Sequence, residues 1–332
     1  MKFAKTLGFR VLTWALVIWI GVSFIFFIPR MFPSDPVEAM IAQMTAKSGT
    51  MEAAQKEALR SALRKQFGLE GTLWEQYTYF IAHGLFQFDF GPSLMNYPTP
   101  VNNIINLYLP YTLFLSLTGT ILGWCVGNVI GLLAGFRANK MSSKIMETIA
   151  ICIYPIPYFI VALVLQIVFA FLLGWFPVQS NILTTGTTAQ FITSWIRGSA
   201  LPLIAGLLVG TGWWIISMKA LSSTVAAEDY VHYARYRGLS EGRIGFTYVF
   251  RNCILTQVTA LAMQLGGAFN GNLMVEIIFS YPGVGKLVQQ AILQSDYNMI
   301  QGTITISIVA IATATLVADL IYPFIDPRIR YA

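Results

Sequence analysis

Six long runs of apolar residues alternate with polar segments along this chain, and each run has at least 18 residues. That length lets a helix cross about 30 Å of hydrocarbon. A soluble protein folding around one or two cores has no reason to concentrate its apolar residues in this way. Pro155 and Pro157 should kink or break the third run. The pattern predicts six membrane-spanning helices, at residues 11–28, 108–135, 145–175, 201–218, 254–279 and 303–324.

The first run could instead be a signal peptide, because Lys2, Lys5 and Arg10 precede it. A signal peptide ends in a small-x-small cleavage site, whereas this run continues into PRMFP. We therefore expect it to remain as the first span.

The polar segment after the first run, residues 31–107, contains two amphipathic helical patterns. Thr50 precedes a pattern whose apolar residues share one face and which stops at Gly68, so we expect Thr50 to cap a helix. Thr72 and Glu75 have the spacing of a capping box ahead of the second pattern. The segment is expected to be a folded external region.

The orientation follows from the basic residues, because short loops rich in Lys and Arg tend to stay in the cytoplasm. The start of the chain, residues 137–144, residues 219–251 and the end carry 3, 3, 5 and 2 of them. Residues 175–200 and 280–302 carry one each. Both termini are therefore expected in the cytoplasm.

Composition agrees with a membrane protein, since 56% of the residues are hydrophobic and 11% are charged, against roughly 25% charged in soluble domains. The net charge of +6 does not indicate nucleic-acid binding, because the basic residues are scattered between apolar runs. The three cysteines have unrelated spacings and predict neither disulfides nor a metal site. His83 and His232 are expected in different compartments, so no acid-base or nucleophilic constellation can be drawn. We expect a non-catalytic chain without a metal.

The stretch SYPGVGKLV, residues 280–288, contains the letters GVGK and invites comparison with a nucleotide-binding loop. That loop reads G-x-x-x-x-G-K-[ST]. Ser280 stands in place of its first glycine and Leu287 in place of its hydroxyl residue. We expect no ATP here, and a turn in which the Gly and Lys residues end a helix at the membrane surface.

The fifth run carries polar residues and glycines inside an apolar span. Polar groups facing lipid are costly, and glycines permit close packing or a hinge. These residues either line a translocation pathway or join helices to one another, and both interpretations stay open. The candidates are Gln257, Gln264, Gly267, Asn270 and Asn272.

The loop of residues 219–251 is too polar to enter the membrane. A loop that only turned the chain would need a few residues. Its length indicates either contact with a cytoplasmic partner or a self-packed loop. Ala234 and Gly238 lie four residues apart, and small residues would let another surface approach a short helix closely.

EDYVHYARYRGLS, residues 228–240, resembles the coupling-loop signature of permease subunits in ABC importers of the dipeptide, oligopeptide and nickel family. FPSDPV, LRKQFGL, FDFGPSL, VEIIFSYPGVGKLV with DYNMIQG, and DLIYPFIDPRIRY resemble further family stretches in the same order. Tyr233 and Tyr236 depart from the small or aliphatic residues common in the family. The candidate coupling residues are Glu228, Asp229, Tyr230, Ala234, Arg235, Gly238, Leu239, Arg243 and Arg251.

The resemblance implies an all-α, polytopic membrane protein with six transmembrane helices of the type I ABC importer permease fold. Residues 1–30 would form the cytoplasmic N-terminus and first helix, and residues 31–107 an external helical insertion. Residues 108–332 would form a five-helix core with a cytoplasmic loop of residues 219–251, called the coupling loop below.

The resemblance also implies a permease subunit in the inner (cytoplasmic) membrane that shares the pathway with a second homologous permease. Two cytoplasmic ATPase subunits would hold ATP and magnesium, and an external binding protein would deliver the substrate. Peptides are the expected substrate, with oligosaccharides and nickel complexes left open. A membrane-embedded enzyme is a distant alternative, as is a secondary transporter, which would usually show an internal inverted repeat.

Overall fold

The structure is a computed structural model that describes residues 2–31, 35–48, 52–182, 186–267 and 273–325. Within these ranges the regular structure is helical, apart from one isolated bridge between Pro92 and Pro100. The all-α prediction is confirmed.

The chain divides into two compact units. Unit 1 comprises Met1–Tyr111 and Gly283–Leu316, and unit 2 comprises Thr112–Pro282 and Val317–Ala332.

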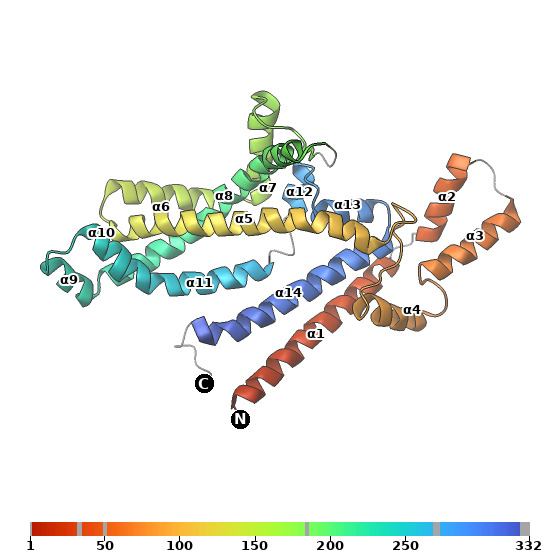
Figure 1. Ribbon diagram of the computed structural model, residues 1–332, viewed down its shortest axis with the longest axis horizontal. Coiled ribbons are helices and arrows are strands. Elements are labelled where there is room, and N and C mark those ends of the chain that lie inside the picture. The colour runs from red at the N-terminus through yellow and green to blue at the C-terminus, as the bar shows by residue number, and fades with distance from the viewer. Residues whose placement is uncertain (1, 32–34, 49–51, 183–185, 268–272, 326–332) are drawn as a thin grey trace. The chain divides into compact units, whose positions relative to one another are not determined.

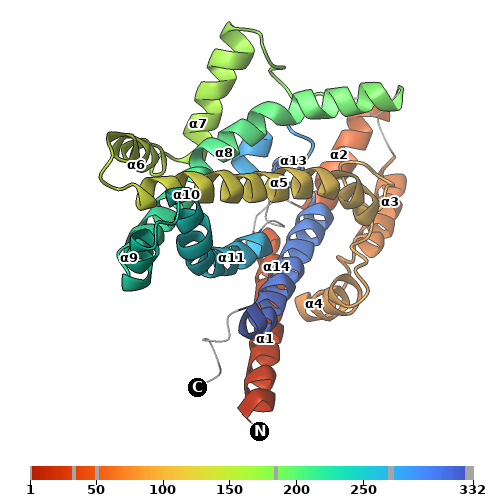
Figure 2. The ribbon, with the colours of Figure 1, turned by 60° about the vertical axis from the view of Figure 1, so that its left-hand side comes forward.

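Unit 1 is built around the first and the last helix of the chain, which lie side by side (Figures 1 and 2). The Trp14 indole donates a hydrogen bond to Thr313 Oγ1 at 3.2 Å. Gly21 lies so close to Ile308 that a Cβ at Gly21 would be 3.1 Å from that side chain. The helices of this unit are α1 (Lys2–Arg30), α2 (Pro36–Ser48), α3 (Ala53–Gln66), α4 (Leu73–Phe80), the π-helical turn η1 (Ile81–Leu85), the start of α5 (Val101–Phe136), α13 (Val284–Leu293) and most of α14 (Tyr297–Ile325).

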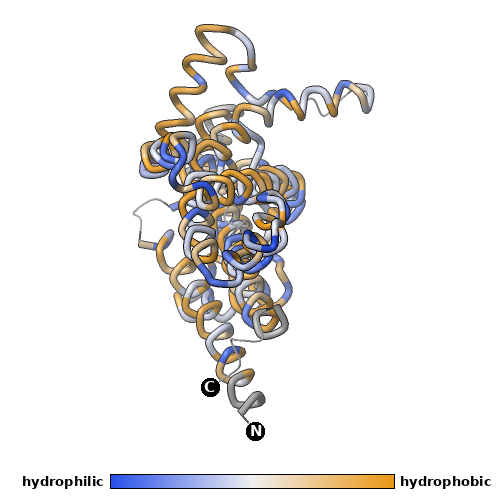
Figure 3. Tube along the Cα trace, turned by 90° about the vertical axis from the view of Figure 1, so that its left-hand side faces the viewer, coloured by the Kyte–Doolittle hydropathy of each residue, from blue (hydrophilic) through white to orange (hydrophobic). Residues whose placement is uncertain are grey.

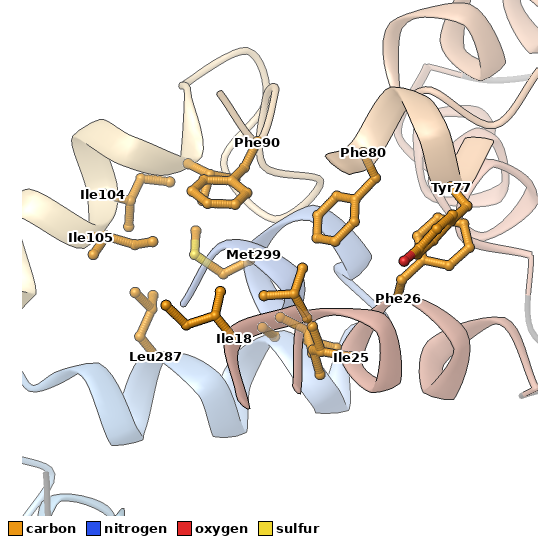
Figure 4. Close-up of a cluster of buried hydrophobic side chains, with 14 of the residues drawn as sticks. Ile18, Ile25, Phe26, Tyr77, Phe80, Phe90, Ile104, Ile105, Leu287 and Met299 are labelled. Atoms are coloured by element: carbon orange, nitrogen blue, oxygen red, sulfur yellow. The ribbon is translucent and has the colours of Figure 1, made fainter. Parts of the chain in front are cut away.

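The core of unit 1 joins α1 and α14 to α4, α5 and α13 (Figure 4). The Phe26 ring of α1 packs against Tyr77 and Phe80 of α4, with centroid distances of 5.3 and 5.6 Å. Other members drawn in the figure are Ile18, Ile25, Phe90, Ile104, Ile105, Leu287 and Met299. This core fixes α4 against the end of the first predicted span.

The two helical patterns expected after the first span are both present. Leu63 of α3 and Phe67, which directly follows α3, are buried against α2, so the predicted apolar face is confirmed. Arg60 of α3 forms an ion pair with Glu38 of α2 at 2.5 Å. The two helices therefore pack through an apolar face that an ion pair flanks.

One helix start in this region differs from the prediction. α3 begins after Glu52, and Glu52 makes no capping hydrogen bond through its side chain. A capping side chain must stand directly before the helix to reach its first amides. Thr50, which lies outside the described residues, stands two residues too early, so the prediction that it caps α3 is wrong.

The second predicted start is confirmed. The Thr72 amide donates to Glu75 Oε2 at 2.7 Å, and the Glu75 amide donates to Thr72 Oγ1 at 3.3 Å. These reciprocal bonds form the expected capping box at the start of α4.

The stretch SYPGVGKLV turns the chain between two helices. α12 ends at Ile278, and α13 begins at Val284 after an extended Gly283. The prediction that its Gly and Lys residues end a helix is wrong, because they stand at the start of α13. Val284 and Leu287 are buried, so apolar packing explains why the helix starts there.

Unit 2 is organised around the long helix α8, against which both α6 and α7 pack. Its elements are the rest of α5, α6 (Met141–Ile153), α7 (Tyr158–Leu165), η2 (Gln166–Leu172), α8 (Thr188–Ala226), α9 (Asp229–Tyr236), α10 (Glu241–Arg243), η3 (Ile244–Phe250), α11 (Arg251–Gly266) and α12 (Leu273–Ile278).

Apolar residues extend along much of the long helices (Figure 3). Within the described ranges, four helices are long and apolar enough to cross a membrane: Leu7–Arg30, Val101–Phe136, Thr188–Ala226 and Tyr297–Ile321. A fifth candidate is the pair Met141–Ile153 and Tyr158–Leu172. The predicted fifth span corresponds to α11 and α12, between which residues 268–272 lie outside the described part. The count of six therefore remains a prediction.

The third predicted span is sharply bent. α6 and α7 meet at an angle of 98°, across a break that contains Pro155 and Pro157. Proline lacks the amide hydrogen that a helix needs, and its ring clashes with the preceding turn. The predicted break is confirmed.

Candidate functional site

The coupling loop forms a short helix, α9, with a clear start and end. Glu228 precedes it in an extended conformation, and Asp229 occupies the first turn, where a negative charge favours the helix dipole. Gly238 has a φ of +73°, a region that L side chains rarely adopt. The Leu239 amide donates to the Ala234 carbonyl at 3.3 Å across this turn. Gly238 thus terminates α9.

The inner face of α9 packs on its own chain. Val231 and Ala234, three residues apart, are 0% and 4% exposed. They join a cluster that we call the loop cluster, formed with Leu132 of α5, Met218 of α8, Ile244 and Val249 of η3, and Cys253 of α11. The Ala234 side chain therefore packs inside its own chain and not toward an outside surface. A short polar helix is stable only when such a stripe is buried, and Ala234 belongs to that stripe.

The outer face of α9 is rich in tyrosine. Tyr233 and Tyr236 are 69% and 85% exposed, and Tyr230 is 40% exposed. The Tyr230 hydroxyl accepts a hydrogen bond from Asn252 Nδ2 at 3.1 Å. Partial burial, followed by the charge of Glu228, raises the pKa of Tyr230. Tyr230 therefore stays neutral at physiological pH. The three tyrosines present large rings beside polar hydroxyls.

The basic candidates of the loop have different surroundings. Arg235 forms an ion pair with Glu241 at 3.2 Å and lies 5.5 Å from the centre of the Phe136 ring. Arg243 and Arg251 are exposed, and neither makes an ion pair with the residues that the structure describes. Leu239 packs against the loop cluster.

The loop cluster links α9 mechanically to the ends of α5, α8 and α11. Lys219 of α8 also forms an ion pair with Glu147 of α6. A force applied to α9 would therefore reach α5, α8 and α11 through packed side chains, which transmit displacement well because protein interiors are dense.

The pathway candidates of the fifth span fall into separate groups. Gln257 is 1% exposed, and its Nε2 donates to Ser217 Oγ of α8 at 2.9 Å. The backbone carbonyl of Gln257 accepts a hydrogen bond from the Trp124 indole of α5 at 3.0 Å. Gln257 therefore joins α11 to two neighbouring helices, as the interpretation of helix-to-helix contact predicted. Asn270 and Asn272 lie outside the described residues.

Gln264 and Gly267 line a cavity of about 350 Å³ within unit 2. Its walls come from α5, α7, α8 and the end of α11. The Tyr158 hydroxyl, which lies at this wall, donates to the Pro202 carbonyl at 3.1 Å. The lining contains no Asp, Glu, Lys, Arg or His among the described residues. The cavity is thus polar in places but uncharged.

A row of glycines, which the pattern of apolar runs does not reveal, lies on α5 at positions 119, 123, 127, 131 and 135. Their four-residue spacing, which places them on one helix face, was the signal that could have found them. At Gly131 a Cβ would lie 2.7 Å from the Ile215 carbonyl oxygen of α8. Gly127, Gly131 and Gly135 let α5 and α8 pack closely, whereas Gly119 and Gly123 line the cavity.

The described residues contain no group of three or more His, Cys, Asp or Glu side chains that could hold a metal ion. Cys125, Cys152 and Cys253 are free thiols.

Comparison with known proteins gives consistent results. Residues 127–331, more than half of the chain, match the family model of the binding-protein-dependent transport system inner membrane component. The oligopeptide transport system permease protein AppB of Bacillus subtilis (strain 168) is 30% identical over 319 residues, which cover 96% of each chain. The glutathione transport system permease proteins GsiC of Shigella boydii serotype 4 (strain Sb227) and Escherichia coli (strain K12) are each 28% identical over 310 residues, or 92% of each chain. The chain belongs to the family of inner membrane components of binding-protein-dependent transport systems.

Proposed function

We propose that this chain is the permease subunit of an ATP-driven importer and forms half of a translocation pathway for peptides. The relatives named as oligopeptide and glutathione permeases align with more than nine-tenths of its length. Glutathione is itself a small peptide, so both named cargoes share one chemistry. The described helices supply several segments that could cross a membrane.

The observation that carries this proposal is the placement of α9. The helix is anchored from within by Val231 and Ala234, and it presents Tyr233 and Tyr236 outward. Exposed aromatic side chains on a rigid support are typical anchors of protein interfaces. A cytoplasmic ATPase subunit docking there would move α5, α8 and α11 through the loop cluster when nucleotide closes the ATPases.

The division of labour follows from this arrangement. We place ATP and magnesium on two separate ATPase subunits. The sequence supports this division, because SYPGVGKLV lacks the glycine and the hydroxyl of a phosphate-binding loop. A second homologous permease completes the pathway, and an external binding protein delivers the peptide. This chain is a non-catalytic subunit of the inner membrane, with both termini in the cytoplasm.

The test uses the assembled complex in liposomes that contain ATP. A cysteine in place of His232, exposed on α9, should crosslink to an ATPase subunit through a short bifunctional reagent. Thr247→Cys, exposed on η3, provides the comparison.

The second test measures uptake. Labelled oligopeptide should accumulate in the liposomes only when ATP, the ATPase subunits and the binding protein are present. Accumulation without the ATPase subunits, or crosslinks from Thr247→Cys but not from His232→Cys, would contradict the proposal.

A further inference from the structure

Five glycines in helical segments face the uncharged cavity of unit 2: Gly119, Gly123, Gly206, Gly210 and Gly267. Their neighbours do not require glycine at most of these positions. Among the described residues, a Cβ at Gly210 or Gly267 would meet no atom within 4 Å, and at Gly119 or Gly123 it would make ordinary contacts at 3.9 Å. None of the five has a φ in the left-handed region. Neither packing nor backbone conformation therefore explains why glycine occupies positions 119, 123, 210 and 267.

The other glycines of the α5 row, at positions 127, 131 and 135, differ from the cavity-facing ones because α8 lies close to them. A Cβ at Gly131 would lie 2.7 Å from a carbonyl oxygen and 2.8 Å from the Met218 side chain, so close packing of α5 on α8 explains Gly131. Glycine weakens a helix relative to alanine. Gly206 has such a contact, because a Cβ there would lie 2.7 Å from the Tyr158 hydroxyl. The other four cavity-facing glycines bear the cost without a tight contact, and the space that they leave open is what remains to explain it.

The cavity has the size and lining of a ligand site. Its volume of about 350 Å³ lies within the ~300–1,000 Å³ typical of such sites. The wall includes the polar side chains of Ser116, Thr120 and Gln264, and none of its described residues is charged. Such a wall can contact amide groups and neutral side chains, but it offers no counter-charge to an ionised group.

We propose that these glycines keep this cavity free of side chains so that cargo can pass, and that the cargo segment passing here is a peptide chain with neutral side chains. This inference rests on the proposed function. It assigns to these five glycines the width of the half of the translocation pathway that this chain forms. A helix of the second permease packed into the same groove is the competing occupant, because small residues also favour close helix contacts.

The first experiment measures whether the cavity holds water and needs no knowledge of the cargo. Gly210→Cys is placed in a chain whose three native cysteines are replaced, and the assembled complex is treated with hydrophilic thiol reagents. Val164→Cys is the control, because Val164 is 53% exposed on α7 but does not line the cavity. Gly210→Cys should react and Val164→Cys should not, and cationic and anionic reagents of equal size should react at similar rates. An unreactive Gly210→Cys in an assembled complex would overturn the proposal.

The second experiment narrows the cavity by placing larger side chains at Gly210. ATP-driven peptide uptake should fall stepwise through Gly210→Ala, Gly210→Val and Gly210→Leu, while co-purification with the second permease and the ATPases is unchanged. Gly8→Leu is the matched control, because Gly8 is helical on α1 and also has nothing within 4 Å. Wild-type uptake in Gly210→Leu would overturn the proposal, and so would loss of the second permease, which would identify the groove as an interface. Failure of the unmodified complex to import peptide would instead refute the proposed function and leave the thiol result standing.

Discussion

Gly238 is the residue at which a backbone requirement and the proposed coupling role coincide. Its φ of +73° ends α9, and an L side chain in this region costs about 1–2 kcal/mol. Gly238→Ala should therefore loosen the end of α9, lower the thermal stability of the assembled complex and reduce ATP-driven uptake. Gly238→Asn should do less harm, because asparagine tolerates this conformation.

The control for Gly238 is a second glycine with the same strain and no place in the coupling loop. Gly174 has a φ of +64° and nothing within 4 Å of a Cβ. Gly174→Ala should lower stability by a similar amount and leave the uptake rate per assembled complex unchanged. Equal losses of uptake in the two variants would show that strain alone, and not the end of α9, is responsible.

Tyr233 and Tyr236 are the side chains most suited to anchor an ATPase subunit. A buried tyrosine at the centre of an interface can contribute about 2 kcal/mol or more, so Tyr233→Ala or Tyr236→Ala should weaken ATPase binding by roughly 30-fold. Titration of detergent-solubilised permease with labelled ATPase measures the change. Tyr233→Phe separates the ring from the hydroxyl, and Tyr79→Ala, 52% exposed on α4, is the control. Unchanged affinity in both α9 variants would exclude these rings as anchors.

At the scale of one helix, α9 depends on its buried stripe. Ala234→Glu would place a carboxylate in the loop cluster without a cation among its members, and burying an unpaired charge is strongly unfavourable. We expect α9 to leave the cluster, so that uptake is lost while the chain still inserts into the membrane. Ala234→Ser, which adds one small hydroxyl, should retain most uptake. Normal uptake and ATPase association in Ala234→Glu would contradict the role of this contact.

The elements that the sequence predicted well are those whose signals are local. The capping box of Thr72 and Glu75 and the break at Pro155 and Pro157 each depend on a few neighbouring residues. The inward direction of Ala234 depends on Leu132 and Met218, which are distant in sequence, so the loop pattern alone could not predict it. Spacing alone could not separate the glycines that pack from those that face the cavity, because the difference lies in where α5 and α8 diverge.

At the scale of the whole molecule, the spans were predictable because hydropathy depends only on composition over a window. Four of the six predicted spans coincide with single long helices, and the third coincides with the bent pair of α6 and α7. The orientation of these spans is a separate inference. It depends on the basic residues of the short loops and on the need for ATPases beside the coupling loop.

The orientation prediction places Ser142 and Ser240 in the cytoplasm and the start of α8 outside. Thr187 caps α8 through its hydroxyl, so the exposed Ala189 is the better external reporter. Each position receives a single cysteine in the chain without native cysteines, and intact cells are treated with a membrane-impermeant thiol reagent. Ala189→Cys should react at once, whereas Ser142→Cys and Ser240→Cys should react only after the cells are opened. The loop-charge argument and the coupling-loop argument assign the same side independently. Reaction of Ser240→Cys from outside would therefore overturn both the orientation and the docking of an ATPase on α9, even if Ala189→Cys behaved as expected.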